Sequence, residues 1–178
     1  MTTTGASEDS HRFRSNQLTY ANMPIDLVLV RHGESEGNIA KDRADPALYK
    51  TSFGDRHTSR YRLTDRGRTQ ASQAGSWLRQ TFPDGFDFYF CSEYVRAIET
   101  AAHLNLPDAT WTLDRYLREK DSGVFGGRPG ATTKEQEKEE KQRRERDYYY
   151  YAAPGGESIA ACVMRIDMFL SYLAERCS

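Results

Sequence analysis

Apolar and polar residues alternate along the chain in a pattern that predicts strands followed by helices. Residues 25–30 (IDLVLV) form a short β-branched apolar run, which is typical of a strand buried on both faces. Two further strands are predicted, over residues 86–91 and 109–113. Apolar residues at helical spacing predict three helices, over residues 64–83, 93–104 and 157–175. This alternation favours an α/β fold in which helices cover both faces of the sheet.

Two polar stretches depart from this alternation. Residues 1–23 are rich in Thr, Ser, Asn and charge without an apolar period, so we expect a disordered leader before a single domain over residues 24–178. Residues 134–147 are almost wholly charged. Their charges have mixed sign and no apolar heptad, which favours a solvated helix over a coiled coil or an RNA-contacting segment. A lid over a site is the remaining alternative.

The composition restricts the classes of function. The chain has 178 residues and a formal net charge of -1, which disfavours a dedicated nucleic-acid binder. No apolar run reaches the length of a membrane span, and residues 1–23 have no block like that of a signal peptide. Three scattered cysteines, Cys91, Cys162 and Cys177, are interpreted as buried free thiols. We expect a cytoplasmic protein without a metal, a cofactor, a nucleic-acid partner or a membrane partner.

The chemistry is concentrated in Arg31-His32-Gly33, directly after the first predicted strand. Ligands of α/β sheets bind beyond the carboxyl ends of the strands, where helix N-termini also attract anions. Arg31 suits phosphate because its guanidinium is a planar, forked donor, and Gly33 lets a phosphate approach the backbone. The alternative is a histidine that simply follows a strand, and three residues alone do not decide between the two.

The wider sequence favours phosphate chemistry. Residues 31–38 (RHGESEGN) resemble the Arg-His-Gly-Glu-Ser-x-x-Asn motif of phosphoglycerate mutases and histidine phosphatases. Four further segments are similar to motifs of the same superfamily and follow in the same order, at residues 63–67, 92–101, 117–123 and 154–158. The resemblance covers residues 25–176. It implies a three-layer sandwich in which a mostly parallel sheet is flanked by helices.

At the matching positions, the resemblance implies a site for a small phosphorylated substrate. His32 would accept the phosphoryl group, and Arg31 and Arg96 would clamp it. Asn38 would join the phosphate pocket, and Glu119 would act as general acid and base. In this chemistry the neutral imidazole attacks phosphorus and the arginines stabilise the charge on its oxygens. The carboxyl group then protonates the leaving oxygen and later activates water.

Several of these residues have plainer alternatives. Arg96 and Glu119 could be solvated surface residues, and Asn38 could cap or end the first helix. Glu157 and Ser158 are interpreted as helix capping, because an acid in the first turn complements the helix dipole.

Other features stand outside the motifs. His57 and His103 match no part of the resemblance, and His11 lies in the leader. The four tyrosines of residues 148–151 are interpreted as partly buried packing instead of a ligand-stacking site.

The resemblance fails at one point. The superfamily uses a second histidine on a late strand, and all four histidines of this chain precede that place. We therefore expect the domain to be incomplete at its C-terminus, as in a truncated chain. A non-catalytic module that binds phosphate or phosphoprotein is the alternative.

The loop after Glu119 bears on the activity. Phosphoglycerate mutases have an Arg and a Tyr in this loop, where this chain has Lys120 and Ser122. We therefore favour a phosphomonoester hydrolase that works through a phosphohistidine on His32. A mutase-type phosphotransferase is the alternative.

Overall fold

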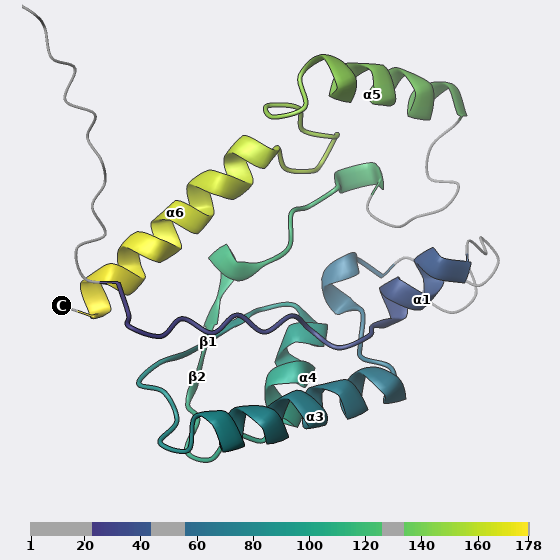
Figure 1. Cartoon of the computed structure of the whole chain (residues 1–178). Helices are drawn as coiled ribbons and strands as arrows, with labels where there is room; N and C mark the ends of the chain where they lie inside the picture. Colours follow the sequence, from purple (N-terminus) through teal and green to yellow (C-terminus); the bar gives the residue numbers. More distant parts are fainter. Residues whose placement is uncertain (1–22, 44–55, 126–133, 178) are drawn as a thin grey trace, which may run out of the picture.

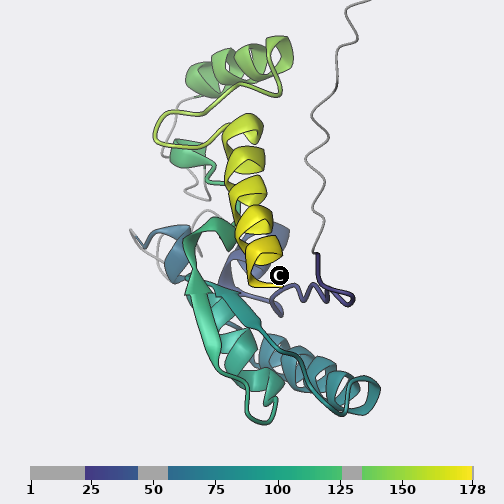
Figure 2. The same ribbon diagram turned by 90° about the vertical axis from the view of Figure 1, so that its left-hand side faces the viewer.

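The computed structural model describes residues 23–43, 56–125 and 134–177 (Figure 1). Its strands are β1 (Tyr89–Ser92) and β2 (Trp111–Asp114). Its helices are α1 (Glu36–Arg43), α3 (Asp65–Thr81), α4 (Val95–Leu104), α5 (Lys134–Arg146) and α6 (Ile159–Arg176). Within these ranges, short 3₁₀ turns cover Thr58–Arg60, Arg115–Leu117 and Gly123–Phe125. In both views α3 and α4 lie together at one end of the molecule and α5 at the other, with α6 between them (Figures 1 and 2).

The sheet is parallel and is connected by a helix. β1 pairs with β2 so that Tyr89 lies opposite Trp111, and α4 makes the crossover that parallel strands require. α4 packs against α3 and β1. α6 contacts β1 through Phe90, whose ring centroid lies 5.2 Å from that of Phe169. The predicted α/β fold, a parallel sheet flanked by helices, is confirmed.

The apolar core follows from the helical patterns. The buried apolar side chains of α3, α4 and α6 lie at helical spacing, at Ala71, Leu78, Ala101, Leu104, Phe169 and Leu173. α3 begins where predicted, because the Thr64 hydroxyl accepts a hydrogen bond from the Gly67 amide at 3.0 Å. The close approach of α3 to α4 depends on Gly75, where a Cβ would lie 1.9 Å from the Leu104 carbonyl oxygen.

The first predicted strand, residues 25–30, is not a strand in this structure. The segment is extended but unpaired, and Leu29 is 85% exposed. It borders a cleft of about 1110 Å³ whose other walls include β1 and α6. Within the described residues β1 pairs only with β2, so the apolar run has no strand beside it. The prediction of a buried strand is therefore wrong, because burial needs neighbours that the pattern itself cannot supply.

Two smaller predictions also need correction. Tyr148 and Tyr150 are 68% and 69% exposed, so the predicted packing of the tyrosines is wrong for these two. Cys91 is a buried free thiol as predicted, and burial raises its pKa to about 11. Cys162 and Cys177 are free but only partly buried.

The two polar stretches differ in outcome. The predicted leader lies outside the described residues, apart from its last residue, Met23. The charged stretch is helical as α5, and its described side chains are mostly exposed. None of the helices within the described ranges is both long and apolar enough to cross a bilayer.

Candidate active site

The loop that carries His32 is held against the start of α3 and the middle of α4. The Gly33 amide donates to the Thr100 hydroxyl at 3.2 Å. A Cβ on Gly33 would lie 2.2 Å from the Gly67 carbonyl oxygen, and one on Gly67 would lie 2.0 Å from the Glu34 carbonyl oxygen. The two glycines therefore allow backbone to pack on backbone at this point. The position of the histidine is set by these close contacts.

Asn38 secures the start of α1. Its Oδ1 accepts from the amide and from the hydroxyl of Ser35, both at 3.0 Å, and its own amide donates to the Ser35 carbonyl at 2.9 Å. This agrees with the capping alternative for Asn38. Asn38 is not one of the described residues that line the cleft together with His32.

His32 has one defined tautomer. Its Nδ1 lies 2.7 Å from the Gly33 carbonyl oxygen. Because a carbonyl can only accept, Nδ1 carries the proton and Nε2 keeps its lone pair. Burial lowers the pKa of His32 most strongly, and the charges of Arg96 and Arg31 lower it further, against the opposing effects of the Gly33 carbonyl and Glu119. The ring is therefore held neutral, which is the form that a nucleophile needs.

Arg96 is the buried cation of the site. It is 5% exposed, and its Nη1 donates to the Thr58 carbonyl at 2.8 Å. Its Nη2 donates to Glu119 Oε2 at 2.6 Å, and its Cζ lies 4.8 Å from the centroid of the Tyr94 ring. The Glu119 side chain is 68% exposed, so this carboxylate lies between the guanidinium and solvent.

The structure brings four of the five predicted site residues together. Arg31, His32, Arg96 and Glu119 line the same cleft, and the three charged ones all act on the pKa of His32. Asn38, in the first turn of α1, is not among the described residues that line this cleft. The cleft therefore combines a neutral imidazole, two guanidinium groups and a carboxylate, a set suited to a phosphate group.

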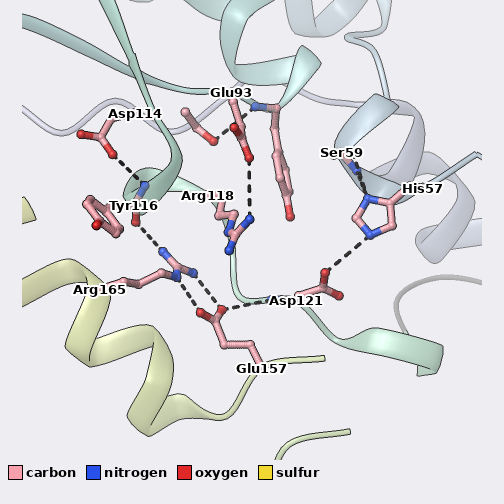
Figure 3. Close-up of polar contacts among 11 residues, drawn as sticks. His57, Ser59, Glu93, Asp114, Tyr116, Arg118, Asp121, Glu157 and Arg165 are labelled. Atoms are coloured by element: carbon pink, nitrogen blue, oxygen red, sulfur yellow. Dashed lines mark hydrogen bonds and ion pairs between the residues drawn. The ribbon is translucent and has the colours of Figure 1, made fainter. Parts of the chain in front are cut away.

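The loop after Glu119 is tied to α6. Glu157 accepts from Arg165 Nε at 2.6 Å and Nη2 at 2.9 Å, and its amide donates to the Asp121 carbonyl at 2.9 Å (Figure 3). The hydrogen bonds from Arg165 hold the pKa of Glu157 below its ordinary value. Ser158 caps α6 as predicted, accepting from the Ala161 amide at 3.0 Å. Glu157 was predicted to cap α6 as well, but its carboxylate pairs with Arg165 and so ties the loop after Glu119 to α6.

Some contacts of the site were missed by sequence reasoning. Thr100 lies inside a matched motif, yet its hydrogen bond from the histidine loop was not predicted. Thr58 acts through its carbonyl, which no side-chain pattern reveals. Glu99 accepts from the Leu63 amide at 2.7 Å and from Arg62 Nε at 2.6 Å. Burial opposes its ionisation, but these hydrogen bonds prevail and lower the pKa of Glu99.

No group of three or more His, Cys, Asp and Glu side chains in the described ranges is arranged to hold a metal ion.

Comparison with known proteins places the chain in a family. Residues 27–178 match the histidine phosphatase superfamily (branch 1). The chain is 35% identical over 144 residues to a 2,3-bisphosphoglycerate-dependent phosphoglycerate mutase of Methylocella silvestris, covering 79% of this chain and 64% of that protein. It is 32% identical over 164 residues to the fructose-2,6-bisphosphatase TIGAR B of Danio rerio, covering 89% of this chain and 55% of that protein.

A solved structure agrees with this placement. The alpha-ribazole phosphatase from Shigella flexneri aligns with a TM-score of 0.62 at 25% identity, covering 83% of this chain and 66% of that one. This chain belongs to the histidine phosphatase superfamily. It spans 64% and 55% of the two curated relatives named above.

Proposed function

We propose that the site belongs to a phosphomonoester hydrolase that works through a phosphohistidine on His32. One observation carries the proposal: the Gly33 carbonyl fixes the proton on Nδ1 and leaves the Nε2 lone pair in a cleft lined by two arginines. The proteins named above are a mutase and two phosphatases, and each of their names specifies a small phosphorylated compound as the substrate.

The first half-reaction follows from the charges in the cleft. His32 Nε2 attacks phosphorus, and the bond from phosphorus to the leaving oxygen breaks. Arg31 and Arg96 stabilise the charge on the remaining phosphoryl oxygens. Arg96 Nη2 now binds Glu119, so a phosphate oxygen would replace that carboxylate as its partner. Glu119, once protonated, gives its proton to the leaving oxygen.

The second half-reaction returns the enzyme to its starting state. Glu119 takes a proton from water as the water oxygen attacks the phosphohistidine. The phosphorus–nitrogen bond breaks, the electron pair returns to His32 Nε2, and inorganic phosphate leaves. The scheme needs no metal ion, because the arginines supply the positive charge.

The exposure of the acid favours hydrolysis over mutase chemistry. A mutase must keep its phosphohistidine away from water until the second substrate arrives. Glu119 is 68% exposed at the cleft, so water can reach the group that would activate it. In the loop of residues 119–123, here called the acid loop, Lys120 and Ser122 also stand where phosphoglycerate mutases carry an Arg and a Tyr.

The test is phosphoryl transfer from an aryl phosphate, measured on the 178-residue chain. We expect an acid-labile, base-stable phosphoryl group on His32 and its loss in His32→Ala. Arg96→Ala should slow transfer by about 10²–10³-fold, as for loss of one preorganised donor. His103→Ala is the matched control, since His103 lies at the other end of α4, roughly 10 Å along the helix from Arg96.

Two results would contradict the proposal. Transfer that survives His32→Ala, or the lack of any transfer by the wild-type chain, removes His32 as the nucleophile. Faster transfer from the phosphohistidine to a phosphoglycerate than to water would establish the mutase instead.

A further inference from the structure

His57 has a defined tautomer and faces the acid loop. It begins the 3₁₀ turn Thr58–Arg60, where its Nδ1 accepts from the Ser59 amide at 3.2 Å and lies 2.9 Å from the Ser59 hydroxyl. Because a backbone N–H can only donate, Nδ1 carries the lone pair and the ring proton is on Nε2. Nε2 lies 3.5 Å from Asp121 Oδ2 (Figure 3). The N–H group therefore faces a carboxylate.

Contacts on both sides of this pair lead to the site. The carbonyl of Thr58, next to His57, accepts a hydrogen bond from Arg96 Nη1 at 2.8 Å. Arg96 Nη2 donates to Glu119 at 2.6 Å, and Asp121 follows Glu119 by two residues. The His57–Asp121 contact thus completes a closed ring of contacts, which runs from the turn through Arg96 to Glu119 and returns through Asp121 to His57.

Asp121 is a firm support for this ring. Its Oδ1 accepts a hydrogen bond from the Gly123 amide at 2.8 Å. Its backbone amide donates to the Glu157 carboxylate at 3.3 Å, and its carbonyl accepts from the Glu157 amide at 2.9 Å. Glu157 is in turn paired with Arg165 of α6. Oδ2 is therefore held toward His57 by contacts that α6 anchors (Figure 3).

The ring has a specific task during phosphoryl transfer. When phosphate takes Arg96 Nη2, the Arg96–Glu119 ion pair must open. Among the contacts described for the turn and the acid loop, the His57–Asp121 pair then remains as a link that phosphate does not replace. Without it, the turn that holds Arg96 could shift relative to the anchored loop of Glu119. The distance from Glu119 to the leaving oxygen of a phosphate bound by Arg96 would then vary, and proton transfer depends steeply on that distance.

We propose that His57 and Asp121 are positioning residues, which keep the Thr58 carbonyl and the Glu119 carboxylate in register while Arg96 exchanges Glu119 for phosphate. The inference rests on the proposed function and names two residues to which neither the motifs nor the comparisons assign a role. Loss of the pair should lower kcat and leave KM nearly unchanged, since Thr58 still holds Arg96 through its backbone.

Two amide substitutions separate this role from simple capping of the turn. In His57→Asn, the side-chain oxygen replaces Nδ1 and can still cap the turn, but no group reaches Asp121. In His57→Gln, the amide N–H lies near the position of Nε2 and can still face Asp121. We expect His57→Asn to lower kcat between about 10-fold and 10²-fold, and His57→Gln to restore most of it.

A double-mutant cycle completes the experiment. Asp121→Asn should lower kcat as much as His57→Asn, because its amide would oppose the Nε2–H, and the double variant should fall no further. His103→Asn serves as the control. All variants are assayed by phosphoryl transfer from an aryl phosphate, with thermal melting to confirm that each folds.

Each outcome decides the inference. An active wild type with an unimpaired His57→Asn, or with additive effects of His57→Asn and Asp121→Asn, overturns the inference and leaves the proposed function standing. A Gln variant as poor as the Asn variant shows that the Nε2 contact is not the cause and also overturns it. A wild type without phosphoryl transfer overturns the proposed function and the inference together.

Discussion

Residues 25–30 and residues 33–35 are separated by two positions, yet the structure holds them in different ways. Residues 33–35 are fixed by short polar contacts, such as that from Gly33 to Thr100, and by glycine packing on Gly67. Residues 25–30 are extended, and their apolar side chains border an open cleft. His32 lies at the junction between the fixed loop and the open segment.

The difference reflects two kinds of stabilisation. Hydrogen bonds and backbone packing are directional and involve few atoms, so contacts with two helices are enough to fix a loop. Burial of an apolar run is not directional and needs surface on several sides. The site region therefore keeps its geometry even where the neighbouring segment has no strand beside it.

The largest effect expected on the fixed side comes from the tether of the acid loop. In Glu157→Gln, the Arg165 guanidinium, whose side chain is 8% exposed, loses its carboxylate, which should cost roughly 3 kcal/mol of unfolding free energy. Urea denaturation measures this, with Glu175→Gln on the exposed side of α6 as the control. Equal, small effects of both variants would show that the tether does not fix the loop.

The pH dependence of this tether has a definite sign. Because the pKa of Glu157 is lowered from 4.5 in the folded state, its contribution to stability is present above pH 4.5 and is lost as pH falls through the lowered value. Glu157→Gln should therefore reduce the loss of stability in acid relative to the wild type.

A smaller effect is expected from two glycines of α3. Gly67→Ala and Gly75→Ala each place a methyl group against a backbone carbonyl, and each should cost about 1–3 kcal/mol. Only the first contacts the His32 loop, through Glu34, so only Gly67→Ala should weaken the binding of inorganic phosphate well below the melting temperature. Calorimetric titration of both variants makes the comparison. Equal loss of phosphate binding would show that the loop is not held locally.

The sequence predicted the features that depend on local contacts and missed those that depend on burial. Local signals placed α3, through the Thr64 cap and Pro83, and also placed α4, α6, β1 and β2 within a few residues. The motifs pointed to His32, Arg31, Arg96 and Glu119, which share one cleft. The sequence did not predict that residues 25–30 are exposed and unpaired, because burial depends on what lies beside a segment.

Other contacts were beyond prediction for a different reason. Arg96 is held by a backbone carbonyl, and His57 reaches Asp121 across 64 positions of the chain, so neither contact leaves a local pattern. The exposure of Tyr148 and Tyr150 shows the converse error, since a run of aromatic residues does not by itself define a core.

The proton equilibrium of His32 gives a smaller effect that links the two regions. Its pKa is lowered from 6.5, chiefly by burial, so the neutral nucleophile should persist below pH 6.5. As pH falls below 6.5, the unfolded chain binds a proton first, and stability decreases until the folded-state pKa is passed. His32→Gln should remove this decrease in a series of denaturation curves. An NMR titration that gives His32 a pKa at or above 6.5 would contradict the prediction.

The smallest expected effect is the sharpest test of the open segment. Leu29 is 85% exposed, so Leu29→Ala should change the unfolding free energy by less than about 0.5 kcal/mol. Leu104, the last residue of α4, is fully buried, and Leu104→Ala should cost roughly 2–5 kcal/mol. The same denaturation experiment compares the two leucines, which lose the same atoms. A cost for Leu29→Ala near that of Leu104→Ala would mean that residues 25–30 are buried in solution, as their apolar pattern predicts, and that the contrast between the two regions does not hold.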